Sequence, residues 1–314
     1  MRINEILAAE SPVFSFEFFP PKTEAGEQNL YRALSELKPL QPSFVSVTYG
    51  AGGSSRSKTI EIVKRIKEDF GLEAMAHFTC VGATEPELRD TLDEMQRAGI
   101  DNVLALRGDP PEGQEAWTKT EGGLEYSSEL VELIGGDYEF AIGAACFPET
   151  HIHAESAESD LRYLAEKVRS GVDFLITQMF FDNSFYFDFV RRARAVGIGV
   201  PIIPGIMPIT RVGQVERMAS MCGSAIPEGL RAELHAREDD AEAVLDFGVA
   251  NATLQCAELL AAGAPGIHFY TLNRSPATRA ILSALKLARP WERAIYPASI
   301  SSPSATRGEP SGAS

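Results

Sequence analysis

Apolar residues along the chain follow two alternating periods, one typical of strands and one typical of helices. Short apolar or alternating segments indicate strands, and between them apolar residues recur at helical spacing, as at Leu30, Leu34 and Leu37. The pattern predicts strands at 13–19, 44–48, 73–79, 102–106, 139–145, 172–177, 200–203 and 266–270. A helical segment follows each predicted strand.

A strand–helix unit repeated about eight times is the count that closes a (β/α)8 TIM barrel. No stretch rich in Pro, Gly or Ser divides the pattern, so we expect one barrel domain of the α/β class over residues 1–296. The segment 297–314 is rich in Ser, Pro, Ala and Gly without an apolar period, which predicts a disordered tail. A doubly wound open sheet is the alternative. It usually carries a glycine fingerprint in the first strand–helix turn, which here is Phe-Phe-Pro-Pro.

The first predicted strand holds a single carboxylate among aromatic residues. With a period of two, Ser15 and Glu17 share one face of this strand, whereas Phe16 and Phe18 share the other. Two prolines follow directly and end the strand, because proline donates no ladder hydrogen bond. Glu17 is therefore the last inward-pointing residue, and taken alone it fits a structural ion pair as well as a catalytic role.

Polar side chains capable of catalysis or recognition follow the ends of nearly all predicted strands. In a barrel of this kind the active site lies at the C-terminal ends of the strands, and several strands contribute to it. Such a cluster favours an enzyme over a binding scaffold. The residues at the strand ends are Glu17, Thr48, His77, Arg107, Asp109, Phe147, His151, Gln178, Gly205 and the segment 270–274, and most of them are polar.

Taken singly, several of these residues also have a structural interpretation. His77 fits a satisfied core histidine, Asp109 fits a turn cap before two prolines, and Gln178 fits a buried amide bonded to the backbone. The glycine-rich segment 50–55 resembles a phosphate cradle but lacks the Gly-Lys-Ser/Thr of a P-loop.

A row of three polar residues lies on the predicted helix that follows the fifth strand. Asp160, Tyr163 and Lys167 are one to two turns apart. They fit either a solvated helix face or a line of contacts to a ribose and a phosphate, with Lys167 meeting the anion. Periodicity leaves both interpretations open.

Composition bounds the partners of the protein. With 44 acidic and 29 basic residues the net charge is −15, which argues against a nucleic-acid partner or an anionic membrane. No apolar run reaches the roughly 18 residues of a membrane span. Four widely separated cysteines without a CxxC spacing fit a reducing compartment, so we expect a cytoplasmic protein. The five histidines offer only the short spacing His151-x-His153, and we expect no metal site.

Six motifs, in order and on a common spacing, resemble the methylenetetrahydrofolate reductase family. The resemblance runs from about residue 10 to about residue 290 and does not include the regulatory C-terminal domain of eukaryotic members, so the chain looks like the short bacterial type. The motifs are FEFFPPK at 16–22, VTYGAGG at 47–53, RGD at 107–109, ITQMFFD at 176–182, PGIMP at 204–208 and HFYTLNR at 268–274.

The resemblance implies a flavoprotein that binds FAD and takes hydride from NADH or NADPH. It implies the reduction of 5,10-methylenetetrahydrofolate to 5-methyltetrahydrofolate by a ping-pong scheme, in the one-carbon metabolism that feeds methionine synthesis. Barrels of this kind often assemble, so we also expect a homo-oligomer. The sequence does not indicate which nicotinamide nucleotide is used, because it has no Rossmann acid or 2′-phosphate arginine to distinguish them.

The resemblance also assigns roles to individual residues. Glu17 matches the general acid, and Asp109 is the second residue expected to act in catalysis. The positions that match flavin contacts are Thr48, Tyr49, Ala51, His77, Arg107, Gly108, Asp109, Ser127, Phe147, His151, Ala154, Asp160 and Lys167. The positions that match substrate contacts are Asp109, Gln178, Gln214, Met218 and Arg274.

Five positions depart from the family pattern. Phe147 replaces a tyrosine and Ser127 replaces an alanine at flavin-contact positions, and Met218 stands where an apolar or aromatic residue packs on the substrate. Tyr163 and Glu166 stand where polar or basic groups often meet the adenine-side phosphates. A carboxylate at position 166 repels a pyrophosphate unless it turns away.

The expected chemistry requires a proton on the folate nitrogen that departs when the five-membered ring opens. A neutral carboxylic acid at Glu17 would supply it, and we expect burial among Phe16, Phe18 and Phe19 to raise its pKa toward neutrality. Asp109 would stabilise the resulting iminium cation. Two other classes stay open, namely another flavin-dependent barrel oxidoreductase acting on an imine and a non-catalytic barrel subunit.

Overall fold

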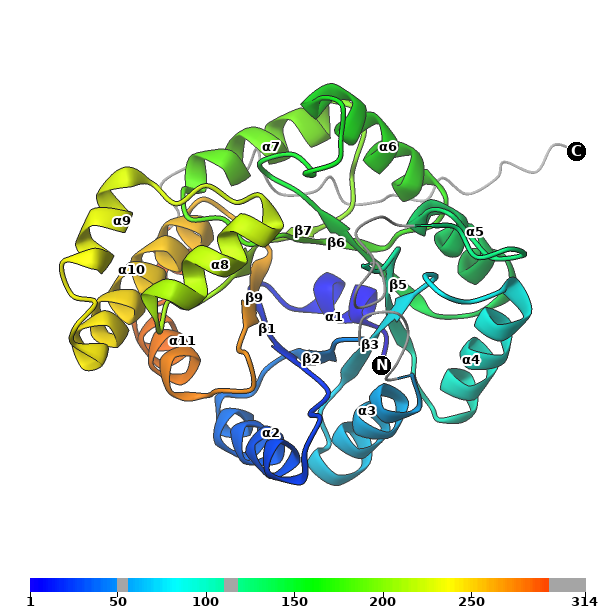
Figure 1. The fold of residues 1–314 in the computed structure, drawn as a ribbon, viewed down its shortest axis with the longest axis horizontal. Helices are drawn as coiled ribbons and strands as arrows, with labels where there is room; N and C mark the ends of the chain where they lie inside the picture. The colour runs from blue at the N-terminus through cyan, green and yellow to red at the C-terminus, as the bar shows by residue number, and fades with distance from the viewer. Residues whose placement is uncertain (50–55, 110–117, 294–314) are drawn as a thin grey trace, which may run out of the picture.

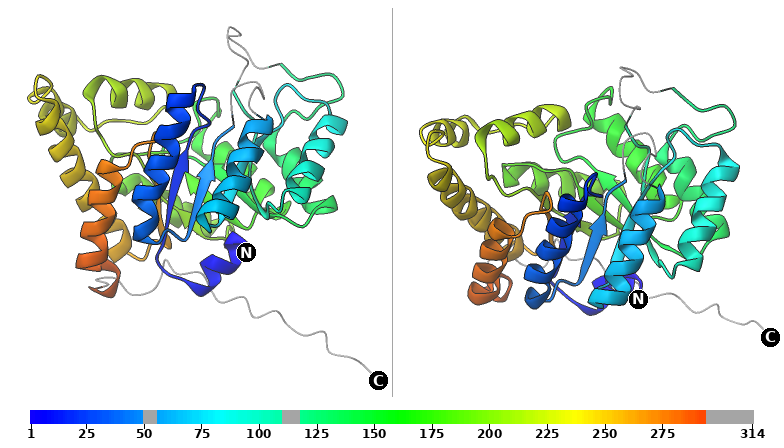
Figure 2. Two further views of the ribbon diagram at one scale, coloured as in Figure 1. Left: turned by 90° about the horizontal axis from the view of Figure 1, so that it is seen from below. Right: turned by 60° about the horizontal axis from the view of Figure 1, so that its bottom comes forward.

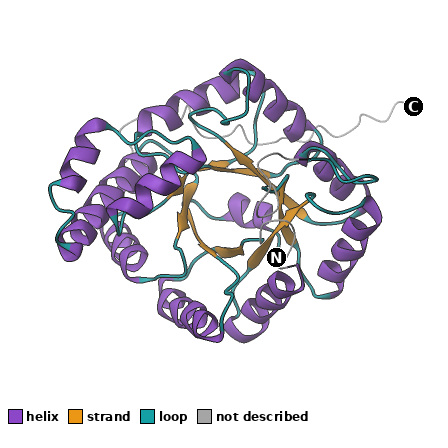
Figure 3. Ribbon diagram, viewed as in Figure 1, coloured by secondary structure: helices purple, strands orange, loops and turns teal. Residues whose placement is uncertain are grey.

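In the computed structural model, which describes residues 1–49, 56–109 and 118–293, the strands form a ring and the helices surround it (Figure 1, Figure 3). The paired strands are all parallel, in the order β7-β6-β5-β4-β3-β2-β1-β9-β8. The strands are β1 (Val13–Phe18), β2 (Phe44–Val47), β3 (Ala74–Thr79), β4 (Asn102–Leu106), β5 (Ala141–Cys146), β6 (Phe174–Thr177), β7 (Ile202–Ile203), β8 (Gly205–Ile206) and β9 (Gly266–Tyr270). The prediction of a (β/α)8 barrel is confirmed, and the open doubly wound sheet is wrong.

The ring closes at Pro204, the single residue between β7 and β8. Because β7 pairs with β6 and β8 pairs with β9, the predicted seventh strand contributes to both sides of the closure. The backbone N–H of His268 donates to the carbonyl oxygen of Pro204 at 2.9 Å. Close by, Gly205 N donates to Thr177 Oγ1 at 2.9 Å, and Tyr270 Oη donates to the Thr177 carbonyl oxygen at 2.6 Å. In the described part of the chain, nine short strands therefore form a ring with eight strand positions. A proline fits the break between β7 and β8 because it has no backbone N–H that would be left unpaired.

The helices alternate with the strands as predicted. Side chains cap the N-termini of several helices. Thr23 Oγ1 accepts a hydrogen bond from Gly26 N at 3.1 Å, and Asp240 Oδ1 accepts one from Glu242 N at 3.0 Å. The bounds are α1 (Ile3–Ala9), α2 (Glu24–Leu37), η1 (Lys38–Leu40), α3 (Arg56–Phe70), α4 (Glu85–Arg97), α5 (Ser127–Asp137), α6 (Ala157–Arg169), α7 (Asn183–Ala195), α8 (Val212–Cys222), α9 (Glu228–His235), α10 (Ala241–Ala261), α11 (Pro276–Ala288) and η3 (Pro290–Arg293). Among the described residues, no helix has the length and apolar character needed to cross a membrane. The tail predicted at 297–314 and the glycine-rich segment 50–55 lie outside the described residues.

The two faces of the strands build different cores. Phe16 and Phe18 of β1 pack in the core that the strands share with the surrounding helices. Val13, from the same strand, packs in a separate core inside the ring. The predicted alternation along β1 is therefore confirmed, and it turns Ser15 and Glu17 into the ring.

Helix α1, which the apolar pattern did not predict, covers one end of the ring. Ile3 and Ile6 are buried in the inner core. The backbone N–H of Ile3 donates to Asn102 Oδ1 at 2.7 Å, and Asn102 Nδ2 donates to the carbonyl oxygen of Met1 at 3.1 Å. Asn102 is the first residue of β4, so α1 lies at the N-terminal ends of the strands, and Figure 2 shows it below them.

Candidate functional site

A cavity of about 1590 Å³ lies at the C-terminal ends of the strands, the end of the ring away from α1. Its walls come from the strand ends, from the loops that follow them, and from the helices α5, α6, α7 and α8. Sites for one small ligand typically occupy about 300–1,000 Å³. This cavity therefore has room for a cofactor together with a substrate.

The cavity collects most of the residues that the sequence predicts for the site. Ala51 lies outside the described residues. Gln214, on α8, does not line the cavity, and Arg274 lines a second, smaller one. The predicted residues that do line it are Glu17, Thr48, Tyr49, His77, Arg107, Gly108, Asp109, Ser127, Phe147, His151, Ala154, Asp160, Lys167, Gln178 and Met218.

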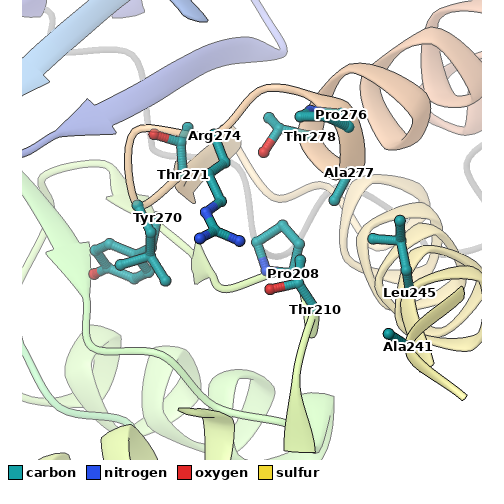
Figure 4. Close-up of a pocket in the computed structure, with 11 residues that line it drawn as sticks. Pro208, Thr210, Ala241, Leu245, Tyr270, Thr271, Arg274, Pro276, Ala277 and Thr278 are labelled. Atoms are coloured by element: carbon teal, nitrogen blue, oxygen red, sulfur yellow. The ribbon is translucent and has the colours of Figure 1, made fainter. Parts of the chain in front are cut away.

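The second cavity, of about 150 Å³, lies next to the large one (Figure 4). Figure 4 shows the Arg274 guanidinium between Tyr270 and Pro208. Tyr270 lines both cavities, so the two spaces share this side chain as a wall. A ligand that contacts both Gln178 and Arg274 has to extend past Tyr270.

Glu17 lies between two histidines on the inner face of the ring. Its Oε2 is 3.3 Å from Nε2 of His77, on β3, and 3.4 Å from Nε2 of His268, on β9. The His268 contact is a hydrogen bond, whereas His77 Nε2 is not aligned for one. Nδ1 of His268 lies 2.8 Å from Ser15 Oγ, and Thr271 Oγ1 donates to the carbonyl oxygen of Glu17. The two histidines that flank the carboxylate are therefore both carried by strands.

The expectation that the pKa of Glu17 rises toward neutrality is wrong. Burial acts to raise this pKa, but the charge of His77 and the hydrogen bond from His268 outweigh it and lower the pKa to about 2. The physical reason is the strand alternation, because Phe16 and Phe18 point away from Glu17 toward the helices. Imidazoles take the place expected for phenyl rings, so the carboxylate is ionised at neutral pH.

His268 is a site residue that sequence reasoning missed, although it lies in the motif 268–274. The register pairs Ser15 with His268 and Glu17 with Tyr270. Because side chains alternate along a strand, these four side chains share the inward face. The alternation along the last strand could have identified His268, because the last strand of a closed barrel pairs with the first and His268 then faces the same side as Glu17.

Gly108 shapes the loop that carries two predicted residues into the cavity. Its φ is +92°, and a Cβ at this position would lie 2.4 Å from Cγ1 of Val81. Only glycine adopts this conformation without strain in so little space. Arg107 and Asp109, on either side of it, both line the cavity.

Two unpartnered polar atoms on the cavity wall fit a polar ligand such as a flavin. Thr79 Oγ1 and His77 Nε2 are buried without an aligned hydrogen-bond partner in the described part of the chain, and both residues line the cavity. A buried polar atom costs free energy unless a partner satisfies it. Thr79 was not among the predicted residues, and a threonine inside a strand gives no signal by itself.

The wall beside α6 fits a nucleotide diphosphate. Lys167 Nζ donates to the carbonyl oxygen of Ala145 at 3.2 Å, and burial lowers the pKa of Lys167, with Cys146 and Asp160 acting in the opposite direction. Asp160 Oδ2 accepts the backbone N–H of His151 at 2.9 Å, which ties the loop after β5 to α6. The row Asp160, Tyr163 and Lys167, for which periodicity left two interpretations open, lines the cavity along its whole length.

Comparison with known proteins points to one family. The sequence pattern of the family described as methylenetetrahydrofolate reductase matches residues 2–286. The chain is 40% identical over 312 residues to a methylenetetrahydrofolate reductase (NADH) of Arabidopsis thaliana, covering 93% of this chain and 52% of the plant protein. It is 42% identical over 273 residues to the 5,10-methylenetetrahydrofolate reductase of Escherichia coli, covering 86% of this chain and 90% of that protein. The chain thus spans about half the length of the plant relative and most of the bacterial one.

Among solved structures, the fold is similar to that of a Clostridium thermocellum protein described as binding two copies of 5-methyl-5,6,7,8-tetrahydrofolic acid. The TM-score is 0.59 at 18% identity, and the match covers 91% of this chain and 98% of that one. At this identity the similarity concerns the fold.

Proposed function

The chain belongs to the methylenetetrahydrofolate reductase family, and from this premise we propose that it reduces 5,10-methylenetetrahydrofolate to 5-methyltetrahydrofolate with FAD and a nicotinamide nucleotide. The observation that carries the proposal is the single cavity that holds Glu17, Asp109 and Gln178 together with the predicted flavin contacts. Relatives named as NADH enzymes make NADH the first donor to test. The product would supply the methyl group for methionine synthesis.

The described residues around the cavity are suited to hold FAD. Arg107 and Lys167 would meet its diphosphate, and Asp160 would accept a hydrogen bond from a hydroxyl group of the nucleotide. Thr79 and His77 would satisfy their unpartnered atoms on the polar edge of the ring system. Bound there, FAD supplies hydride transfer, first from the nicotinamide and then to the methylene carbon.

The protein itself would deliver a proton to the substrate and provide a negative charge beside the cation that forms. Because Glu17 is ionised, it would relay a proton to the departing nitrogen and not store one. Nε2 of His77 and Nε2 of His268 lie 3.3 and 3.4 Å from the carboxylate, so both imidazoles are close enough to exchange a proton with it. Asp109 would stabilise the cation that forms when the ring opens.

Anaerobic titration tests the proposal. The purified protein should carry FAD, lose its flavin colour on addition of NADH or NADPH, and regain it when 5,10-methylenetetrahydrofolate is added. A protein that rejects FAD would overturn the proposal. If the nucleotide bleaches the flavin but the folate does not restore it, the chain reduces a different imine.

A further inference from the structure

Asn273 lies in the motif 268–274 and has no role in the proposed function. Its side-chain amide forms two hydrogen bonds with the backbone of Phe19, two residues after Glu17. We propose that Asn273 is a positioning residue, which fixes Glu17 at the place from which it delivers a proton to the folate nitrogen. This inference deepens the proposed function and rests on it.

The Asn273 amide pairs with both polar backbone groups of Phe19. The backbone N–H of Phe19 donates to Asn273 Oδ1 at 2.8 Å, and Asn273 Nδ2 donates to the carbonyl oxygen of Phe19 at 2.8 Å. The arrangement uses the donor and the acceptor of one side-chain amide, so a carboxylate cannot reproduce it. Pro20 and Pro21 follow and have no backbone N–H, so Asn273 binds the last backbone donor of this segment.

These bonds continue the contact between β1 and β9 beyond the point at which the two strands stop pairing. The parallel register runs as far as the pair of Glu17 with Tyr270. The backbone then turns, since φ is +52° at Leu272 and +57° at Asn273. Side chains of this turn replace the backbone ladder, and Thr271 Oγ1 donates to the carbonyl oxygen of Glu17. The backbone of β1 at Glu17 and beyond is therefore held by the turn that follows β9.

Asparagine suits this position for its backbone as well as for its amide. The φ of +57° lies in the left-handed region, which asparagine adopts more readily than most residues other than glycine. Glycine would keep the conformation of the turn and lose both hydrogen bonds to Phe19. The variant Asn273→Gly therefore separates the effect of the amide from the effect of the backbone conformation.

The position of Glu17 matters in the proposed reaction because its proton has to reach one nitrogen of the folate. Glu17, Phe19 and Tyr270 line the same cavity, so the segment that Asn273 holds forms part of the cavity wall. A displacement of about 1 Å in a reacting group can lower a rate about 10²-fold. Arg274, the next residue, matches a substrate contact, so one turn would set the distance between the proton donor and that contact.

Stopped-flow absorbance of the flavin in the loaded protein tests the proposal. In Asn273→Gly, transfer to 5,10-methylenetetrahydrofolate at saturating concentration should fall about 10- to 100-fold. Flavin reduction by NADH should stay within about twofold of the parent rate, because it needs no proton from Glu17. The Kd for the folate should stay within about threefold, because Glu17 would act on the chemical step and not on binding.

Amide hydrogen exchange of the unloaded protein gives a readout that does not depend on activity. The backbone N–H of Phe19 should exchange about tenfold faster in Asn273→Gly than in the parent, because its acceptor is gone. Gln41→Gly is the matched control for both experiments. Gln41 also has a positive φ, of +50°, is exposed and does not line the cavity, so this variant should match the parent.

A double-variant cycle separates positioning from a general loss of structure. If Asn273 acts through Glu17, adding Asn273→Gly to Glu17→Gln should slow transfer to the folate by less than about twofold. A further loss as large as that in the single variant would overturn the proposal. Asn273→Asp keeps one acceptor but places a carboxylate oxygen against the carbonyl oxygen of Phe19, so it should lose at least as much as Asn273→Gly. If Asn273→Gly unfolds early, Asn273→Asp replaces it in the same comparisons.

The inference and the proposed function fail in different ways. A parent protein whose reduced flavin is not reoxidised by 5,10-methylenetetrahydrofolate overturns the proposed function. A parent that is reoxidised, together with Asn273→Gly at the parent rate, overturns the positioning role alone. A raised Kd for the folate with an unchanged saturating rate also overturns it, because Asn273 would then act on substrate binding. Equal losses in both half-reactions overturn it as well, because they would indicate general damage to the site.

Discussion

Nε2 of His77 lies 3.3 Å from Oε2 of Glu17, although their strands are not neighbours in the sheet. Strand β2 stands between β1 and β3, and the side chains meet because the ring curves inward. His268 reaches the same oxygen from the strand on the other side of β1. The ionisation of the Glu17 carboxylate is thus set by histidines from strands on both sides of β1.

Replacing Glu17 should separate the two half-reactions. Glu17→Gln keeps the shape of the side chain but cannot deliver a proton, so transfer to the folate should fall about 10²- to 10⁴-fold. Reduction of the flavin by the nicotinamide nucleotide needs no such proton and should stay within about twofold of the parent rate. Stopped-flow absorbance of the flavin measures each step, and comparable losses in both would contradict the role assigned to Glu17.

Removing the imidazoles should raise the pKa of Glu17. With His77→Gln and His268→Gln combined, burial is no longer opposed by a cation, and the pKa should move from about 2 to above the ordinary value of 4.5. Titration of the carboxyl carbon by NMR measures the change. His235→Gln is the control, since His235 lies on α9 and pairs with Glu216 and Glu238. An unchanged Glu17 pKa in the double variant would show that other groups hold the charge.

Acid should remove stability that Glu17 contributes at neutral pH. Because its folded pKa of about 2 lies below the ordinary 4.5, the contribution is fully present above pH 4.5 and is lost as the pH falls toward 2. The shift corresponds to a loss on the order of 3 kcal/mol in the free energy of unfolding. Urea unfolding at pH 5 and at pH 2.5 measures it in the parent and in Glu17→Gln. The parent should lose more stability than the variant over this interval, and equal losses would rule out this contribution.

A methyl group at Gly205 should damage the closure of the ring. A Cβ there would lie 2.3 Å from the carbonyl oxygen of Thr177 and 2.6 Å from Tyr270 Oη, the two atoms that bond to each other. Gly205→Ala should destabilise the fold by about 1–3 kcal/mol, as overpacking does. Gly229→Ala is the control, because no atom lies within 4 Å of a Cβ at this helical position, and it should be neutral or stabilising by up to about 1 kcal/mol. Urea unfolding compares the two, and equal effects would contradict the close approach at Gly205.

Loss of the charge at Lys167 should weaken both flavin nucleotides. Lys167→Met keeps the length of the side chain but removes the cation beside the expected diphosphate, so the Kd for FAD and for FMN should each rise about tenfold. Without a ligand the variant should be at least as stable as the parent, because burial already disfavours the charge. Fluorescence titration and thermal unfolding provide the two readouts. A change in FAD affinity alone would place Lys167 at the adenosine and not at the phosphates.

The apolar pattern predicted the barrel because both faces of each strand are buried, which leaves short apolar runs that are easily recognised. It also located the strand-end residues that line the cavity, such as Glu17, His77 and Gln178, since the C-terminal ends of parallel strands in a closed ring meet at one place. It did not predict α1, because Ile3 and Ile6 of this short helix become buried only when the strands have formed a ring whose end they can fill. Nor did it predict the environment of Glu17, because the contacts with His77 and His268 depend on strands that are adjacent or curved together in space. Arg274 and Gln214 were expected in the large cavity and do not line it, because their order along the chain does not show which cavity a side chain faces.

Helix α1 closes one end of the barrel. Ile3 and Ile6 fill the end of the ring at which the strands begin, so a ligand that reaches Glu17 has to arrive and depart through the opposite end. Two ligands that both need the inner position beside Glu17 would have to enter one after the other through that end. An excess of either ligand should then slow the entry of the other, because both use the same opening. The order of binding would follow from the architecture of the barrel as well as from the chemistry.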